Sequence, residues 1–269
     1  MRILDVKEIQ AMQLELMKKL HAYLTEKGIP YYMIAGSALG ALRHGGFIPW
    51  DDDIDIAMFR SDYERFLNIC DDFDRTYDIV NYRNREHCDF CLTRIYFPNT
   101  KIVNQSIENT RLDKRMYFDI FPLDNVPEDA TARSALEHAI LDLKRKIYLA
   151  DVRDYNNTAA VIFLKKMRAL LYTSRRQKLL ARCDELMQSY DKCRTTCVCS
   201  MCSQYSFERQ TMPREYYGKP TLRCFEDTEF FLPEQAERYL EHLYGADYAE
   251  LPPESKRRKC CEVYLLSED

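Results

Sequence analysis

The stretch at residues 31–59 constrains the fold of this 269-residue chain more than any other part. It has an apolar run at 31–35, four of the chain's seven glycines at positions 36, 40, 45 and 46, and the segment DDDIDIAMF at 51–59. The order predicts a buried strand, a turn at Gly36-Ser37, a short helix and a second strand. Such a turn lets backbone N–H groups and the Ser37 hydroxyl approach a phosphate in front of a helix N-terminus.

Two carboxylates in the second strand point to metal-assisted chemistry. Asp53 and Asp55 alternate with Ile54 and Ile56, so both acidic side chains are expected on one face of the strand. Neighbouring carboxylates repel each other and need a cation, and oxygen ligands of this kind suit Mg²⁺ or Mn²⁺. A phosphate site beside such a metal pair indicates phosphoryl or nucleotidyl transfer. The alternative is a solvated acidic loop. The preceding Asp51 and Asp52 are expected to be loop residues or to support the ligands from behind, and not to be ligands themselves.

The remaining pattern predicts a mixed α/β protein. Helical spacing covers 6–27, the pair Ser61 and Glu64 resembles a capping box for a helix, and β-like runs lie at 77–82, 88–97 and 101–105. Residues 115–124 alternate as a strand that Pro122 is expected to end. From 127 to about 190 the pattern is helical, with breaks near 155–157 and 173–174. A strand at 196–202 and a helix at 233–245 follow.

Several motifs resemble those of the LicD family, whose members are similar to DNA polymerase β-type nucleotidyltransferases. They are GSALGALRHGGFIPWDDDIDI (36–56), FDIFPLD (118–124), REYYG (214–218), FED (225–227) and YGADYAELPPESKRR (244–258). The resemblance implies an α+β nucleotidyltransferase core with a mixed sheet at 1–125. A helical region at 126–192 and a small C-terminal α+β region at 193–269 would complete the same globular unit.

The resemblance also implies a third carboxylate on a neighbouring strand, which would join Asp53 and Asp55 as catalytic and metal-binding residues. Asp119 and Asp124 are the candidates. Asp119 lies among apolar residues of the alternating strand, where an unpartnered carboxylate is costly. We expect Asp119 to be the third ligand or the general base. Asp124 follows a proline, and its alternative role is to cap the next helix.

Four further side chains near these motifs have either a functional or a structural role. Arg43 can clamp a donor phosphate, together with Gly36 and Ser37, or pair with the local aspartates. His44 is expected to be structural, and Arg94 either faces the site or is an exposed strand arginine. Trp50 can stack on a base or a choline group, although packing is the favoured role.

By resemblance, the protein transfers a phospho-alcohol, most simply phosphocholine, from a CDP-alcohol donor such as CDP-choline to a glycan of the cell envelope. The fukutin-type ribitol-phosphate transferases are relatives, and lipopolysaccharide, teichoic acid or another lipid-linked glycan is the expected kind of acceptor. Two alternatives remain. One is an adenylyl-type nucleotidyltransferase acting on a small molecule, and the other is a non-catalytic nucleotide- or glycan-binding module of the same fold.

Composition limits the partners and the location. The net charge of −4 and the interleaved charges argue against nucleic-acid binding, and the chain has no apolar segment long enough for a signal or a membrane span. We expect a cytoplasmic protein, at the inner face of the membrane if its acceptor is lipid-linked, with most of its eleven cysteines free and buried. The cysteines at 193, 197, 199 and 202 lack standard zinc spacing. The stretch 158–183 has seven basic and no acidic residues, so it either contacts anionic lipid or forms an ordinary amphipathic helix.

Overall fold

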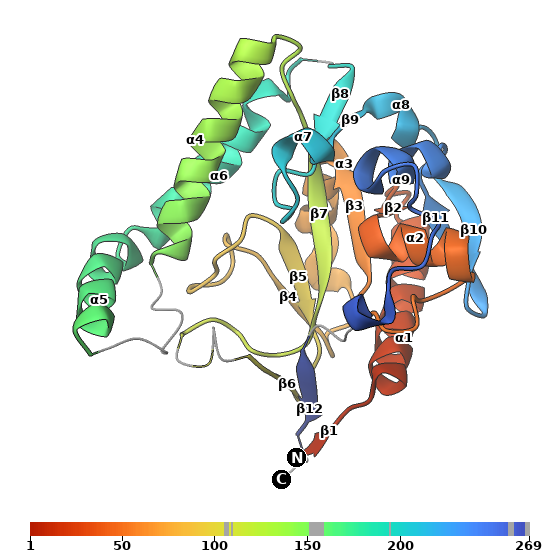
Figure 1. The fold of residues 1–269 in the computed structure, drawn as a ribbon, viewed down its shortest axis with the longest axis horizontal. Helices are drawn as coiled ribbons and strands as arrows, with labels where there is room; N and C mark the ends of the chain where they lie inside the picture. Colours follow the sequence, from red (N-terminus) through yellow and green to blue (C-terminus); the bar gives the residue numbers. More distant parts are fainter. Residues whose placement is uncertain (105–107, 109, 151–158, 194, 258–260, 267–269) are drawn as a thin grey trace.

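The computed structural model describes residues 1–104, 108, 110–150, 159–193, 195–257 and 261–266 (Figure 1). The helices are α1 (Val6–Glu26), α2 (Ala35–His44), α3 (Arg60–Ile69), α4 (Ala130–Tyr148), α5 (Ala159–Thr173), α6 (Arg176–Met187), α7 (Phe207–Gln210), α8 (Arg214–Tyr217) and α9 (Ala236–Tyr244). The strands are β1 (Arg2–Ile3), β2 (Tyr32–Met33), β3 (Asp55–Phe59), β4 (Asp78–Val80), β5 (Thr93–Tyr96), β6 (Thr100–Val103), β7 (Tyr117–Asn125), β8 (Cys197–Cys199), β9 (Thr211–Pro213), β10 (Thr221–Phe225), β11 (Thr228–Leu232) and β12 (Glu262–Leu265). Short 3₁₀ turns lie at Cys70–Asp72, Gln188–Tyr190 and Glu254–Lys256.

A seven-stranded mixed sheet forms the centre of the molecule. Its main path runs β2-β3-β7-β5-β4, and β8 and β9 extend it from the far end of β7. The pair β3 and β7 is parallel, whereas the other pairs in this sheet are antiparallel. The fold is therefore α+β with a mixed sheet, as the sequence predicts.

Strand β7 continues beyond the proline that was expected to end it, so that prediction was wrong. Pro122 lies in register with Met58 of β3, and β7 extends to Asn125. On the other side of β7, the pairing with β5 stops at Ile120 and the pairing with β8 starts at Asp124. Pro122 therefore lies in the gap between these two partners, where its missing N–H interrupts neither ladder.

The helix α1 packs its apolar face against the sheet. Leu16, Met17, Leu20 and Leu24 are buried on this face, and a capping box formed by Asp5 and Glu8 fixes the first turn. The capping box predicted at Ser61 and Glu64 is absent from the described structure, because α3 already begins at Arg60. Glu64 instead accepts hydrogen bonds from Arg83, a partner far along the chain.

The helices α4, α5 and α6 lie together on one side of the sheet (Figure 1), and the helical prediction for 127–190 is confirmed for the residues described. The break expected at 155–157 lies outside the described residues. Side chains of α4 and α6 form a second apolar cluster with the β8 region, including Leu136, Ile140, Leu180, Met187 and Cys199.

The two ends of the described chain meet in a small sheet. Its strand order is β1-β12-β6, so the last strand pairs with both the first strand and the segment at 100–103 (Figure 1). None of the helices described is long and apolar enough to cross a lipid bilayer.

Candidate active site

Three neighbouring strands place charged side chains in one row across the central sheet. Asp55 of β3 lies in register with Asp119 of β7, and Asp119 lies in register with Arg94 of β5. The Arg94 Nε donates a hydrogen bond of 2.8 Å to the Asp119 Oδ1. Residues in register on adjacent strands share a face. The structure therefore brings Asp55, Asp119 and Arg94 together, as the site predictions required.

Arg94 is held firmly in this row. Its guanidinium carbon lies 3.9 Å from the centroid of the Tyr117 ring and 4.2 Å from that of Phe90. Its side chain is largely buried, so the alternative of an exposed strand arginine is wrong. Burial raises the pKa of Asp119, whereas the charge of Arg94 and its hydrogen bond lower it.

The acidic residues at 51–53 lie just before β3 and add negative charge next to the row of Asp55, Asp119 and Arg94. Burial and the neighbouring charges of Asp53 and Asp119 raise the pKa of the Asp55 carboxyl well above its usual range. Asp53 reaches the surface, yet the surrounding protein and the charges of Asp51, Asp52 and Asp119 raise its pKa too. Burial and the charge of Asp52 raise the pKa of Asp51 to about 6. Five acidic side chains thus share a small region in which additional negative charge is unfavourable.

The N-terminus of α2 lies beside this row, and the Ser37 side chain makes a contact there that the sequence did not predict. Its side chain is buried, and its Oγ accepts a 2.8 Å hydrogen bond from the Asp55 N–H. The hydroxyl therefore fixes the start of β3, and it is not among the groups that line the adjoining cleft. Gly36 does line that cleft, and its missing side chain leaves room for the Asp51 carboxylate.

A cleft of about 600 Å³ opens in front of the carboxylates. Its acidic lining consists of Asp51, Asp53, Asp55, Asp247 and Glu250. Among the described lining residues, Arg43 is the sole arginine or lysine. A nucleoside diphosphate is itself anionic, so it would enter such a cleft together with cations that neutralise the carboxylates.

Oxygen donors of this type fit Mg²⁺ or Mn²⁺. Burial and then the neighbouring carboxylates raise the pKa values of Asp53 and Asp55, and a bound cation would oppose both effects. Within the described ranges, no three His, Cys, Asp or Glu side chains are grouped closely enough to form a ready ion site. Asp119 pairs with Arg94 instead. The residues that suit a metal by donor type and position are therefore Asp53 and Asp55, with Asp119 next to them.

Aromatic side chains form much of the remaining cleft wall, and they come from both ends of the chain. They are Trp50, Tyr205, Tyr244 and Tyr248. Trp50 is half-buried, with the Arg257 guanidinium carbon 5.1 Å from its ring centroid and the His44 ring against it edge-on. His44 is exposed outside the cleft lining, which agrees with a structural role.

Arg43 joins the two walls of the cleft. Its Nη1 donates hydrogen bonds to the carbonyl oxygens of Tyr248 at 3.2 Å and Glu250 at 3.0 Å. The predicted ion pair with the local aspartates is therefore wrong, because the hydrogen-bond partners are backbone carbonyls of a distant loop. The guanidinium still lines the cleft, so the prediction that it contacts a donor phosphate stays open.

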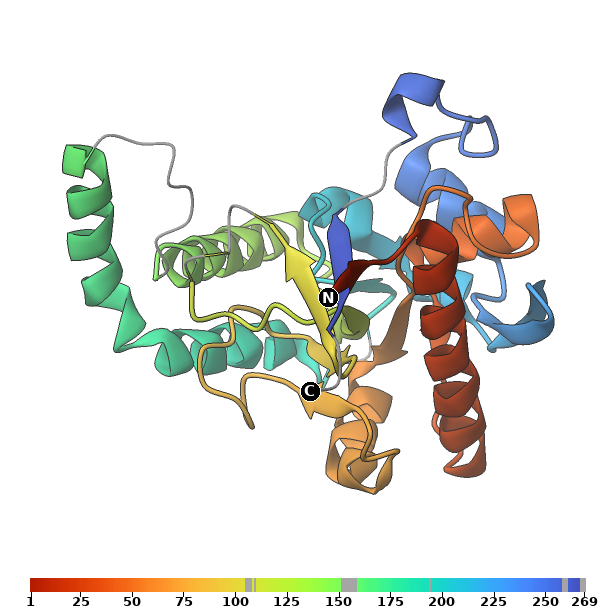
Figure 2. The same ribbon diagram turned by 90° about the horizontal axis from the view of Figure 1, so that it is seen from below.

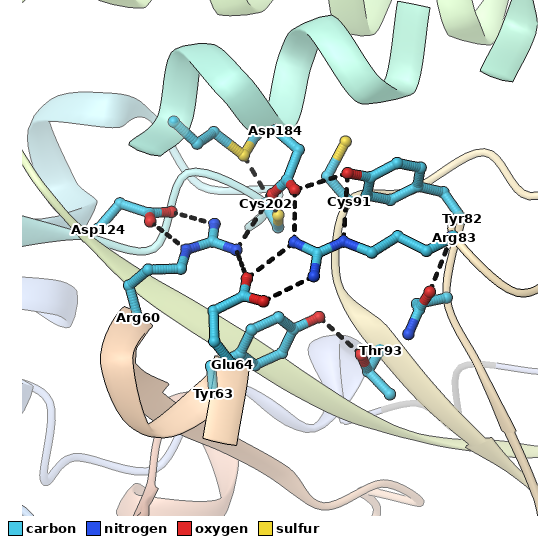
Figure 3. Close-up of polar contacts among 12 residues, drawn as sticks. Arg60, Tyr63, Glu64, Tyr82, Arg83, Cys91, Thr93, Asp124, Asp184 and Cys202 are labelled. Atoms are coloured by element: carbon cyan, nitrogen blue, oxygen red, sulfur yellow. Dashed lines mark hydrogen bonds and ion pairs between the residues drawn. The ribbon is translucent and has the colours of Figure 1, made fainter. Parts of the chain in front are cut away.

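Asp124 lies apart from the carboxylate row. Positions 119 and 124 have opposite parity along β7, so their side chains project from opposite faces of the sheet. Asp124 is fully buried and accepts two hydrogen bonds from Arg60, of 2.6 and 2.9 Å (Figure 3). This contradicts both alternatives for Asp124, third ligand and helix cap, since the cap of α4 is Asp129.

The ion-pair network around Asp124 connects the sheet with the helical region. Arg60 also contacts Asp184 of α6, and Arg83 bridges Asp184 and Glu64 (Figure 3). Burial opposes ionisation of Asp184, but the charge of Arg60 and the surrounding hydrogen bonds hold its pKa below the usual value. The network has no contact with the cleft lining and is a structural connection.

Sequence reasoning missed three residues that support the site. The Tyr239 hydroxyl accepts the N–H of Ala35 at the start of α2, and Gln10 of α1 donates to the carbonyls of Ile48 and Asp51. Glu226 accepts the N–H of Phe47 and packs against Gly46. Glu226 lies in the FED motif, which was the one available signal. The other two contacts connect distant parts of the chain and leave no local pattern.

The cysteines of the described residues are free thiols, as predicted, but only half of the ten are buried. The expectation that most would be buried was therefore too strong. Within the group at 193–202, Cys193 is exposed and Cys197 half-buried, whereas Cys199 is fully buried and Cys202 contacts the Met187 sulfur at 3.9 Å. These four side chains do not converge on one point.

Comparisons with known proteins place the chain in a family. Residues 28–140 match the family model for the LicD/FKTN/FKRP nucleotidyltransferase domain, which covers the carboxylate row and β7. The lipopolysaccharide cholinephosphotransferase LicD of Haemophilus influenzae is 30% identical over 99% of this chain and 100% of its own length. The human ribitol 5-phosphate transferase FKRP is 46% identical over 39 residues, which is 14% of this chain and 8% of that protein. With a relative matched over its full length, this chain belongs to the LicD family and is a phosphotransferase of that type.

Proposed function

We propose that the protein transfers phosphocholine from CDP-choline to a glycan acceptor and releases CMP. Transfer of a phospho-alcohol is the coarser activity that the names of the Haemophilus influenzae enzyme and of FKRP share, and the first of these names adds lipopolysaccharide as the acceptor. The observation that carries the proposal is the row of Asp55, Asp119 and Arg94, of which Asp55 lines an acidic and aromatic cleft.

Choline is the alcohol that the cleft wall supports best. A quaternary ammonium group is attracted to aromatic ring faces and to carboxylates. The cleft offers Trp50, Tyr205, Tyr244 and Tyr248 together with Asp247 and Glu250. A neutral polyol such as ribitol would donate hydrogen bonds to these carboxylates but would have no cation–π attraction to the rings. We therefore propose that CDP-choline binds more tightly than CDP-ribitol.

In the proposed reaction, an oxygen–phosphorus bond forms between the acceptor hydroxyl and the phosphocholine phosphorus, and the bond to the CMP oxygen breaks. Asp119 accepts the hydroxyl proton, since its pKa is already raised by burial. Gly36, in the first turn of α2, and Arg43, in its last turn, position the donor phosphates from the two ends of the helix. A Mg²⁺ or Mn²⁺ ion held by Asp53 and Asp55 would neutralise the charge of the diphosphate.

The test is to incubate the full chain with Mg²⁺, a lipopolysaccharide or other glycan acceptor, and one activated donor at a time, and to measure CMP. CDP-choline should give CMP and a choline-modified glycan, with lower rates for CDP-ethanolamine, CDP-ribitol and CDP-glycerol. Pyrophosphate released from CTP or ATP would favour the adenylyl-type alternative. Donor binding without any product would favour a binding module.

Variants connect the activity with the carboxylates. Asp53→Asn should lower turnover at least about 100-fold while the protein remains folded, because the lost charge acts mainly in the transition state. Asp71→Asn is the matched control, since Asp71 is an exposed aspartate outside the cleft lining. If Asp53→Asn keeps the turnover of this control at saturating Mg²⁺, the site assignment is wrong.

A further inference from the structure

Helix α5 lies at the edge of the molecule, at the far end of the helical region. In both ribbon views it stands away from the central sheet and its neighbours are α4 and α6 (Figure 2). A helix at such an edge normally exposes polar side chains and buries its apolar stripe. We therefore compare the side chains on the exposed face of α5 with those on its buried face.

The exposed face of α5 is the apolar one. Its five large apolar side chains recur at spacings of three and four residues, so they form one stripe along the helix. They are Phe163 (62% exposed), Leu164 (66%), Met167 (51%), Leu170 (66%) and Leu171 (64%). For α5, the interpretation as an ordinary amphipathic helix with a solvated polar face is therefore wrong, whereas α6 does bury its apolar side chains.

The opposite face holds α5 against the protein. Ala169 is buried, Ile162 and Tyr172 are half-buried, and the Thr173 hydroxyl donates to the Ala150 carbonyl at 2.7 Å. The apolar stripe thus points away from the face by which α5 is attached, so it does not belong to the hydrophobic core.

Basic side chains lie beside this stripe. At 100° per residue, Lys166 falls on one side of the stripe and Arg168 on the other, and both are exposed. From Ala159 to Cys183 the chain contains no acidic residue. Within 159–183, the exposed apolar stripe is therefore accompanied by positive charge only. Thr158, where the basic stretch begins in the sequence, lies outside the described residues.

We propose that α5 is an interfacial helix that lies flat on an anionic lipid surface, with its apolar stripe among the acyl chains and Lys166 and Arg168 at the phosphate groups. The helix has 15 residues, about 22 Å at 1.5 Å per residue, which is shorter than the hydrocarbon core of a bilayer. It would therefore lie on the surface and not cross it.

Charge favours lipid over a second copy of this chain as the occupant. Two α5 stripes packed together would bring the Lys166 and Arg168 of each copy close to those of the other, and α5 supplies no carboxylate to pair with them. Anionic phosphate groups neutralise the same residues. This inference does not depend on the proposed function, because lipid binding can be measured without substrate.

The experiment is co-sedimentation of the full chain with vesicles at low salt, using phosphatidylcholine alone or mixed with phosphatidylglycerol. The double variant Phe163→Ser/Leu170→Ser removes apolar contacts, and Lys166→Gln/Arg168→Gln removes charge. Leu222→Ser and Arg223→Gln are the matched controls, because both residues are exposed on β10 at the other end of the molecule (Figure 1). Circular dichroism and the unfolding temperature establish that each variant is folded.

We expect the wild type and both controls to bind the anionic vesicles and to bind the neutral ones much more weakly. Each basic residue near an anionic surface strengthens association about fivefold, so the charge variant should bind roughly 25-fold more weakly. The apolar variant should also lose binding, by at least about tenfold. Absence of wild-type binding to anionic vesicles would overturn the proposal, as would apolar variants that bind normally. A dimer by light scattering that only the α5 variants abolish would assign the stripe to a second copy.

Discussion

Replacing Asp124 and Asp119 one at a time should separate stability from chemistry, because the structure gives the two carboxylates opposite surroundings. Asp124 is fully buried and paired by two hydrogen bonds with Arg60, whose own side chain is 6% exposed. Removing one partner of a buried ion pair costs about 3–5 kcal/mol. Asp184 remains as a second partner of Arg60, so we expect Asp124→Asn to lower the free energy of unfolding by about 3 kcal/mol.

Asp119→Asn should behave in the opposite way. Burial already disfavours the charge on this carboxyl, and Arg94 stays packed between two aromatic rings after the substitution. We therefore expect a smaller loss of stability than for Asp124→Asn. Turnover should fall at least about 100-fold, because in the proposed reaction this carboxylate accepts the proton of the acceptor hydroxyl.

The assay pairs urea denaturation with CMP release from CDP-choline, both measured at a temperature where each variant is folded. The expected pattern is low stability with near-normal turnover for Asp124→Asn, and the reverse for Asp119→Asn. If Asp124→Asn lost turnover as Asp119→Asn does while its denaturation midpoint stayed at the wild-type value, the structural role of Asp124 would be refuted.

Three substitutions near the cleft test other parts of the structure. Burial raises the pKa of Asp51 to about 6, so ionisation makes the metal-free fold less stable as the pH rises from about 4 to about 6. Asp51→Asn should therefore stabilise the protein, freed of metal by a chelator, by about 1–3 kcal/mol at pH 7.5 and hardly at all near pH 4. Equal changes in the free energy of unfolding at both pH values would contradict this. Gly40→Ala would place a Cβ 2.4 Å from the Gly46 carbonyl oxygen and should cost about 1–3 kcal/mol by thermal unfolding, whereas a change below about 0.5 kcal/mol would contradict the packing. Ser37→Ala should cost about 1–2 kcal/mol by removing the acceptor of the Asp55 N–H, with the KM for the donor unchanged, and a large rise in KM would restore the predicted phosphate contact.

The sequence predicted that Asp53 and Asp55 lie together because the strand period is a local property. Their alternation with Ile54 and Ile56 predicted one shared face, and although β3 begins only at Asp55, both side chains line the same cleft. The choice between positions 119 and 124 also follows from parity, but only if 117–125 is one continuous strand. Expecting Pro122 to end the strand removed that argument, and whether a proline interrupts a ladder depends on partners that the sequence does not show.

Side chains with several possible partners made contacts that the sequence did not predict. Ser37 follows a glycine at a helix start, which suits phosphate binding, but its hydroxyl bonds to the Asp55 N–H. Glu64 lies three residues after Ser61, which suits a capping box, but Arg83 holds it with two hydrogen bonds. In both cases a partner distant in sequence prevails over the local pattern, because tertiary contacts decide which of several hydrogen bonds a polar group makes.

The division of the chain into a core, a helical region and a C-terminal region stays a proposal, and the cleft shows why the third part matters for activity. The family match covers 28–140, yet Tyr244, Tyr248 and Glu250 line the cleft from outside that range. Arg43 holds this loop through the carbonyl oxygens of Tyr248 and Glu250, and not through their side chains. Because backbone carbonyls are present whatever the residue, the loop can keep its position while its side chains change. Differences in the alcohol that family members transfer would then arise in this loop, while the carboxylate row on β3 and β7 stays the same.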